Sequence, residues 1–322
     1  MTGARATVLR WAKQGRIEAG ALPRAVAAAG VIPPRADWRA FLGHLFLWTA
    51  VTLIGVGVIF FFAYNWAELG RVARFALVEA LIVAALGFVW RLGLARAGGQ
   101  AALFGAVVLV GALLALVGQT YQTGADTFEL FAAWAALILP WVLVANAGVL
   151  WLVWLALVNI AIWLYFDVRP GGLAGIVFSP VTVQWLLFAL DTVALVAWEL
   201  IGRIRPGAAG RLGPRVLATA SGGFITALAL LSVASGSQEA RGALPIWAAW
   251  LVAAVLVYRR RIPDLYVLAG GVLSVVIIVA SAMLRNLGRA SGDTFLLTAL
   301  VVIGLSAGGA VWLKRVAKEQ AG

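Results

Sequence analysis

Cysteine is absent from the 322-residue chain, and histidine occurs only once. Without thiols the chain can form no disulfide, no thiolate metal site and no cysteine nucleophile. One histidine is too few for a histidine-based metal site, and neither an HExxH zinc helix nor a P-loop occurs. We therefore expect no metal and no cofactor, and nothing in the sequence motivates an enzyme.

Charge is also scarce, because only 12% of residues are charged while 63% are hydrophobic. A soluble domain carries about twice that share of charge. The composition therefore excludes a soluble globular enzyme and a disordered chain, and indicates a polytopic membrane protein in a lipid bilayer. The net charge of +12 does not indicate nucleic acid, because membrane proteins collect Arg and Lys on their cytoplasmic loops.

Long apolar runs dominate the rest of the chain. A helix needs about 20 apolar residues to cross a bilayer, and these runs do not alternate as strands would. We predict an all-α bundle with a cytoplasmic segment 1–40, a transmembrane domain 41–313 and a tail 314–322. The ten predicted spans are 41–63, 72–92, 101–118, 127–145, 147–166, 181–201, 215–235, 243–258, 264–284 and 294–313.

Basic residues divide unevenly between the two sides that these spans define. The side of both termini carries 19 Arg and Lys residues and the other side, side B, carries six. The bias predicts cytoplasmic termini. The run 41–63 is too long for a signal peptide, so we expect an uncleaved anchor. Asn146 predicts a tight hairpin between two spans, and residues 173–179 before Pro180 are candidates for an interfacial or re-entrant piece.

The longest polar interruption on side B is the stretch from Gly118 to Asp126. It is interpreted either as a binding loop or gate for a polar solute, or as an ordered loop that satisfies its own backbone. Asp126 with Glu129, and Asn65 with Glu68, also have the spacing of helix caps. The candidates for an outer-face site are Tyr64, Asn65, Glu68, Gln119, Tyr121, Gln122, Asp126 and Glu129.

Ionisable groups inside spans are costly and are functional candidates. Asp191 lies near the middle of 181–201, and Gln184 shares its helical face. Asp191 is either a proton relay or solute ligand, or a neutral acid satisfied by a neighbouring helix. Glu79 is a further candidate, although a contact with Arg71 or Arg74 explains it more simply. Glu199 is expected to pair with Arg203.

Small and aromatic residues indicate how the helices pack. Gly304 with Gly308 forms a GxxxG pair, and Gly270 with Ser274 a looser one, so we expect helix contacts there, either within one bundle or between two copies. Tryptophans at predicted span ends are typical of the membrane interface. Residues 5–13 and 20–29 predict two short helices broken at Gly15. This segment either packs on the membrane domain or on a cytoplasmic partner, or is a loosely ordered basic tail.

Four local patterns resemble one known family. They are Trp11-x3-Gly15-x-Ile17, Phe62-Ala63-Tyr64-Asn65-Trp66, Gly118-Gln119-Thr120-Tyr121-Gln122, and Trp134 followed by Pro140-Trp141. Together they resemble the predicted bacterial membrane proteins called domain of unknown function 2157, over roughly residues 5–166. The resemblance implies a bacterial inner-membrane location and implies no activity.

Two functions fit these observations. The first is a transporter or permease-like protein for a small polar solute or ion, with Asp191 on the path and the Gln119–Asp126 loop at the outer mouth. The alternative is a membrane-embedded scaffold or sensor that engages a cytoplasmic partner through residues 1–40. An intramembrane enzyme ranks third.

Overall fold

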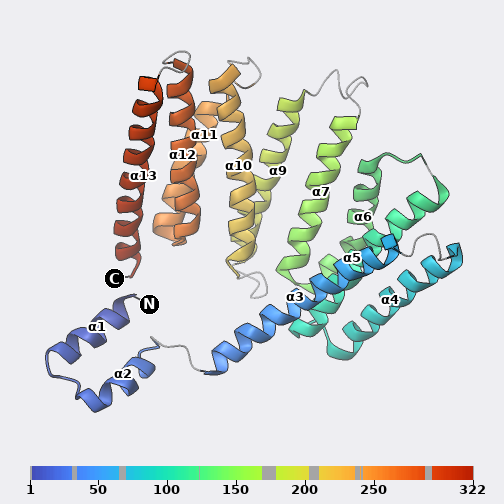
Figure 1. The fold of residues 1–322 in the computed structure, drawn as a ribbon, viewed down its shortest axis with the longest axis horizontal. Coiled ribbons are helices and arrows are strands. Elements are labelled where there is room, and N and C mark those ends of the chain that lie inside the picture. Colours follow the sequence, from blue (N-terminus) through green and yellow to red (C-terminus); the bar gives the residue numbers. More distant parts are fainter. Residues whose placement is uncertain are drawn as a thin grey trace. The chain divides into compact units, whose positions relative to one another are not determined.

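Helices make up the whole architecture of the described chain. Figure 1 shows the computed structural model, which describes residues 2–30, 35–64, 70–122, 124–168, 179–202, 210–235, 240, 242–286 and 292–321. Over these residues the chain forms twelve α-helices and no strand. Ten of the helices are long and apolar enough to cross a membrane. The predicted all-α class and the ten predicted spans are therefore confirmed.

The contacts divide the chain into two units, residues 1–124 and residues 125–320, called here the N-terminal and C-terminal units. The predicted division into 1–40, 41–313 and 314–322 stays a prediction.

The N-terminal unit begins with short helices. They are α1 (Thr2–Lys13), the 3-10 turn η1 (Ala19–Ala21) and α2 (Leu22–Ala28). The predicted break at Gly15 is confirmed, because its φ of +68° is one that glycine adopts without strain. Three long helices follow: α3 (Arg35–Tyr64), α4 (Arg71–Leu92) and α5 (Ala97–Tyr121). Helix α5 contacts both others, and buried Val78 and Leu116 form a small cluster within this unit.

The C-terminal unit contains the other seven helices. They are α6 (Thr127–Ala145), α7 (Gly148–Val168), α9 (Pro180–Ile201), α10 (Leu212–Ser235), α11 (Ala243–Leu256), α12 (Leu265–Asn286) and α13 (Gly292–Ala321). A π-helical turn, η4 (Val257–Arg261), extends α11. Asn146 adopts a left-handed φ of +47° between α6 and α7, so the predicted tight hairpin is confirmed.

Helix α10 is central in the C-terminal unit, because it contacts α7, α9, α11 and α12. Two glycines of α10 allow tryptophans to pack against its backbone. A Cβ on Gly213 would collide with Trp198, and a Cβ on Gly222 would lie 2.8 Å from Trp250. Trp198 is accordingly partly buried against a core cluster rather than standing only at the membrane interface.

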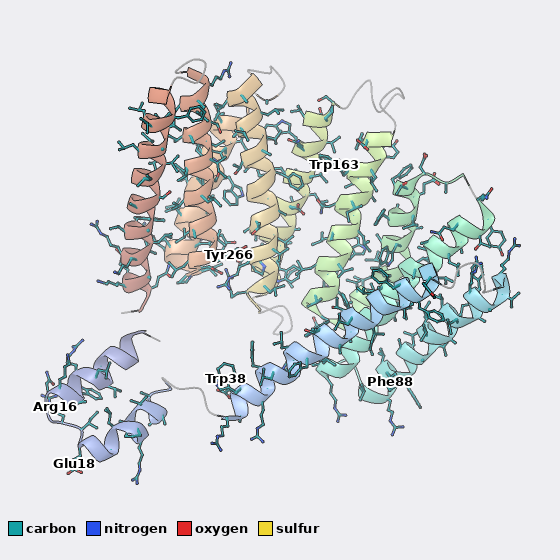
Figure 2. All side chains as sticks on the ribbon, viewed as in Figure 1. Arg16, Glu18, Trp38, Phe88, Trp163 and Tyr266 are labelled. Atoms are coloured by element: carbon teal, nitrogen blue, oxygen red, sulfur yellow. The ribbon has the colours of Figure 1, made fainter. Side chains whose placement is uncertain are left out.

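Large apolar side chains cover the outer faces of the helices (Figure 2). Trp38, Phe88 and Trp163 are 53%, 58% and 45% exposed, and many Leu, Ile and Val side chains are exposed as well. A soluble monomer rarely exposes contiguous apolar surface on this scale. The surface is therefore the kind that a lipid bilayer covers.

The predicted small-residue contact is found at Ser274, which is buried and bonded to Thr226 of α10 and Trp247 of α11, whereas the three glycines show no close approach of a neighbouring helix. A Cβ on Gly270, Gly304 or Gly308 would meet no atom within 4 Å. The close approach between α12 and α13 occurs instead at Gly309, where a Cβ would collide with Val272. GxxxG spacing specifies a face of a helix, but the neighbouring helix here contacts a different face. Of the candidate re-entrant piece 173–179, residues 173–178 lie outside the described residues.

Candidate functional site

The outer-face candidates of the N-terminal unit lie at helix ends. Tyr64 ends α3 and is 90% exposed. Gln119 and Tyr121 belong to the last turn of α5, and Gln122 caps it with a left-handed φ of +46°. The guanidinium of Arg71 lies 5.4 Å from the centre of the Tyr121 ring, so this tyrosine packs against the first turn of α4. Asn65 and Glu68 lie outside the described residues.

Two further outer-face candidates open α6 in the C-terminal unit. Asp126 is the N-cap residue, and Glu129 lies in the first turn with its N–H donating to the carbonyl of Asp126 at 3.0 Å. The helix therefore begins where the sequence predicts. The side chain of Asp126 forms no capping hydrogen bond, so the capping box is not formed. Binding by any of the outer-face candidates stays a prediction.

Glu79 lies on an exposed face of α4 in the N-terminal unit. Of its two expected partners, Arg71 covers the Tyr121 ring, and a contact with Arg74 stays a prediction. Glu79 therefore faces the surroundings of the unit rather than its interior.

Asp191 is the buried carboxyl at the centre of α9, with 1% of its surface exposed. It is one of a stripe of buried residues on this helix, with Val183, Leu187 and Leu195. Its partner is Asn159 of α7, whose Nδ2 donates to Asp191 Oδ1 at 3.1 Å and to the carbonyl of Leu155 at 2.8 Å. A single amide is thus the polar partner that the described structure provides for a mid-span carboxyl.

Three buried oxygens on α7 and α9 have no hydrogen-bond partner among the described residues. They are Asp191 Oδ2, Asn159 Oδ1 and Gln184 Oε1. An unsatisfied buried polar atom costs about 1–3 kcal/mol, so such atoms call for an explanation. All three are oxygens that can accept a hydrogen bond, so the group that would complement them chemically is a hydrogen-bond donor.

Other polar side chains within the spans satisfy one another. Thr192 Oγ1 and Ser221 Oγ lie 2.7 Å apart, and Trp250 Nε1 donates to Ser221 at 3.0 Å. Thr226 Oγ1 and Ser274 Oγ also lie 2.7 Å apart, and Trp247 Nε1 donates to Ser274 at 2.7 Å. These contacts join α9, α10, α11 and α12 and hold the helices together. Asp191 and Asn159 differ from these side chains because each keeps a buried oxygen without a hydrogen-bond partner among the described residues.

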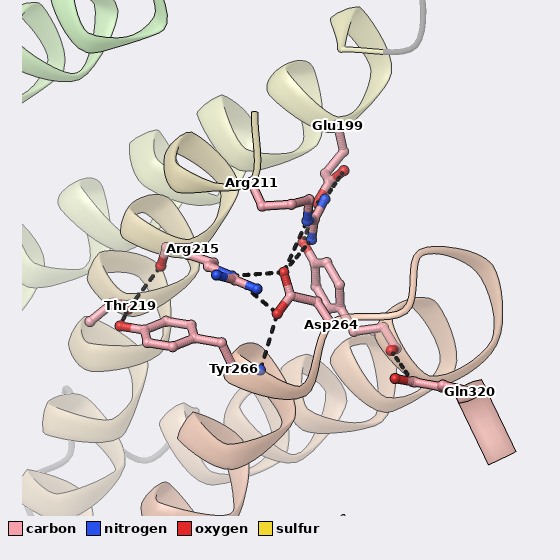
Figure 3. Close-up of polar contacts among 8 residues, drawn as sticks. Glu199, Arg211, Arg215, Thr219, Asp264, Tyr266 and Gln320 are labelled. Atoms are coloured by element: carbon pink, nitrogen blue, oxygen red, sulfur yellow. Dashed lines mark hydrogen bonds and ion pairs between the residues drawn. The ribbon is translucent and has the colours of Figure 1, made fainter. Parts of the chain in front are cut away.

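Charged residues gather at one end of the C-terminal unit, in what we call the ion-pair cluster (Figure 3). Its members come from α9, the start of α10, η4 and the loop before α12. Asp264, with a fully buried side chain, contacts Arg211 Nη2 at 2.8 Å and Arg215 Nε at 3.0 Å. Arg211 Nη1 also contacts Glu199 at 3.0 Å, and the Tyr258 hydroxyl donates to the same carboxylate at 3.0 Å.

The environment of Asp264 stabilises its ionised form. Burial alone raises the pKa of this carboxyl, but the hydrogen bonds from Arg215, Arg211 and the Tyr266 N–H outweigh burial and hold the pKa below its ordinary value. Burial lowers the pKa of Arg211, and the contacts with Asp264 and Glu199 raise it overall. Asp264 and Arg211 are therefore stabilised in their charged forms.

Sequence reasoning missed several of these residues, Asn159 and Asp264 among them. Asn159 is the one polar residue between Gly148 and Trp163. A single polar side chain in an apolar span needs a buried hydrogen-bond partner, and that signal could have identified it. Asp264 follows Pro263 directly before an apolar run, which is a helix-start pattern, and its Oδ1 does accept from the Tyr266 N–H at 3.0 Å. Glu199 pairs with Arg211, while its expected partner Arg203 lies outside the described residues.

Two site types that the residues could suggest find no support. Gly304, Ser306 and Gly308 have the spacing of a GxSxG nucleophile elbow, which requires a strand-to-helix turn. They lie inside α13. Within the described part of the chain, no group of three or more His, Cys, Asp or Glu residues could hold a metal ion.

The fold defines a class, namely a helical membrane protein, here with a buried polar pair within its spans. Residues 9–151 match the model of a protein family described as "Predicted membrane protein (DUF2157)". The match confirms the resemblance over the first part of the chain, and it covers Asn65, Trp66 and the Gln119–Gln122 stretch. Comparisons with curated proteins and with solved structures give no match.

Proposed function

We propose that the chain is a permease-like transport protein for a small polar solute or ion, with Asp191 and Asn159 as its mid-membrane binding site. The observation that carries the proposal is the group of three unsatisfied acceptors at Asp191, Asn159 and Gln184. Ionisable groups at this depth are costly and mark substrate or proton pathways in membrane proteins.

The chemistry of the site narrows the class of solute. Acceptors without donors favour a proton, a cation that carries N–H groups, or a neutral solute that carries hydroxyl or amine groups. On α9, Asp191, Leu195 and Glu199 recur every four residues and so lie on one face. Leu195 is buried and separates the mid-span site from the ion-pair cluster. We propose that Leu195 closes the solute path between Asp191 and the ion-pair cluster.

Location and orientation belong to the same proposal. The excess of Arg and Lys on the side of the termini supports cytoplasmic termini. The family resemblance supports the inner membrane of a bacterium. The ion-pair cluster would then lie at the cytoplasmic face.

Transport is tested with the full chain in proteoliposomes. The probes are protons, followed with entrapped pyranine, and urea and glycerol, followed by light scattering. At least one probe should enter well above the rate of empty liposomes. Asp191→Asn should lower that rate about tenfold or more, the effect of losing about 1.4 kcal/mol of interaction with the solute.

Asp167→Asn is the matched control, because it makes the same chemical change at an exposed position near the end of α7. It should keep the wild-type rate. The proposal fails if no probe enters faster than into empty liposomes, or if Asp191→Asn transports as fast as wild type.

A scaffold or sensor is the second candidate. Leu9 and Trp11 of α1 are 43% and 44% exposed, which is unusual for large apolar residues on a short helix predicted to lie outside the membrane. A variant that lacks residues 2–36 distinguishes the two functions. A transporter keeps its flux without them, whereas a scaffold stays folded and loses the co-purification of its partner.

A further inference from the structure

A groove runs along the outside of the C-terminal unit between α10 and α12. It encloses about 580 Å³, and Trp250 of α11 contributes to its wall. It exists because both helices carry glycines there. A Cβ on Gly223 or on Gly270 would meet no atom within 4 Å, so larger side chains would fill space that these glycines leave open.

The groove has the length of one bilayer leaflet. On α10 it extends from Ala218 to Leu230, which is about 18 Å at 1.5 Å per residue. One half of a bilayer's hydrocarbon core is about 15 Å thick. Its length and its largely apolar wall therefore suit an extended hydrocarbon chain.

The polar side chains of the groove wall need no polar ligand. Thr219 donates to the carbonyl of Arg215, so its contact with the Tyr266 hydroxyl at 3.0 Å uses the tyrosine proton. Likewise Thr226 donates to the carbonyl of Gly222, and its oxygen accepts from Ser274. With these protons used inside the protein, the wall favours an apolar occupant over a polar solute.

A cation stands at one end of the groove. Arg215 precedes Thr219 by one turn on the same face of α10, and its guanidinium lies 5.6 Å from the centre of the Tyr266 ring. Its side chain is 46% exposed, and its hydrogen bonds to Asp264 use only Nε. A guanidinium has five N–H donors, so Arg215 retains donors for an anion.

The surroundings of this end are positively charged. The described residues there include three acids, Glu199, Asp264 and Glu319, against eight basic residues, Arg211, Arg215, Arg259, Arg260, Arg261, Lys314, Arg315 and Lys318. Basic pockets between membrane helices bind anionic lipid headgroups, and Arg suits phosphate in particular.

We propose that the α10–α12 groove is a binding site for one anionic phospholipid, with an acyl chain along Gly223 and Gly270 and the phosphate at Arg215. The site is separate from Asp191 and does not depend on transport.

The test is native mass spectrometry of the purified full chain in detergent, titrated with phosphatidylglycerol and with phosphatidylcholine of the same acyl chains. Wild type should bind one phosphatidylglycerol about tenfold more tightly than phosphatidylcholine. The double variant Gly223→Leu with Gly270→Leu should lose this tight binding, because leucines fill the groove. Gly304→Leu, at an equally open position on α13, should retain it.

Arg215→Gln distinguishes the contribution of the lipid headgroup from that of the acyl chain. This variant should still bind lipid but should lose the preference for phosphatidylglycerol. If this variant fails to fold, the groove-filling variant still decides. Equal affinity of wild type for both lipids, or tight phosphatidylglycerol binding by the filled variant, would overturn the proposal. So would a wild-type dimer that becomes a monomer when the groove is filled, since the groove would then hold a second copy.

Discussion

Two buried aspartates in the C-terminal unit have contrasting surroundings. Asp264 accepts from two guanidinium groups and a backbone N–H, whereas Asp191 accepts from one amide. Cationic donors stabilise a carboxylate, and a lone amide in an apolar span does so far less. Asp264 is therefore a structural charge, whereas the sparse partners of Asp191 are what the proposed transport site rests on.

Replacing Asp264 should destabilise the fold. Asp264→Asn leaves Arg211 and Arg215 without their shared anion, at a cost of roughly 2–3 kcal/mol, since both arginines are partly solvated. Thermal unfolding in detergent measures it. Glu319→Gln is the control, because Glu319 is 56% exposed and its pair with Arg259 is worth about 0–1 kcal/mol. Equal losses for both variants would contradict the assignment.

The same carboxylate predicts an acid dependence. Because the pKa of Asp264 is lowered in the folded state, its stabilisation is complete above the ordinary aspartate pKa of about 3.9 and is lost as the pH falls through the lower folded value. Between about pH 5 and 2 the melting temperature of wild type should fall more steeply than that of Asp264→Asn. Parallel curves of melting temperature against pH for the two proteins would contradict this role of Asp264.

Asp191 should tolerate an amide better than a hydrocarbon. Asp191→Asn can still accept from Asn159 Nδ2 and can donate to Asn159 Oδ1, so its melting temperature should stay near wild type. Asp191→Leu leaves Asn159 Nδ2 without the acceptor oxygen of Asp191 and should lower the free energy of unfolding by about 1–3 kcal/mol. Melting in detergent compares the two, and a stability loss as large in Asp191→Asn as in Asp191→Leu would show that the site needs a carboxylate.

At the scale of elements, packing against α10 depends on which glycine faces a neighbour. Gly222→Ala forces Trp250 to move from a position 2.8 Å from the new Cβ, and overpacking typically costs about 1–3 kcal/mol. The adjacent Gly223→Ala meets open space and gains helix propensity of up to about 1 kcal/mol. The melting temperature should therefore fall for Gly222→Ala and rise for Gly223→Ala. A change of the same sign in both variants would contradict this packing.

At the scale of the whole molecule, the absence of cysteine allows topology to be measured directly. Single cysteines replace Gln14, Gln122 or Lys318, all exposed positions. In right-side-out vesicles a membrane-impermeant maleimide should label Gln122→Cys alone. In inside-out vesicles it should label Gln14→Cys and Lys318→Cys. Labelling of Gln14→Cys and Lys318→Cys from opposite faces would require an odd number of spans.

The spans themselves were predictable because a run of about 20 apolar residues is a local property. Helix α6 covers Thr127–Ala145 and α9 covers Pro180–Ile201, against predictions of 127–145 and 181–201. Helix α13 continues to Ala321 rather than to 313, because a polar helix can extend beyond the membrane and hydropathy gives no signal for its end.

The amino-acid sequence by itself determined the class of protein, the ten spans, the hairpin at Asn146 and the mid-span position of Asp191. Only the tertiary structure decided which groups meet. It paired Asp191 with Asn159 across 32 residues and Arg211 with Asp264 across 53. It also turned Gly309 rather than Gly304 toward Val272 and left the α10–α12 groove open. Hydropathy fixes how long a helix is, whereas its partners depend on its rotation about its own axis and on side chains distant in the chain.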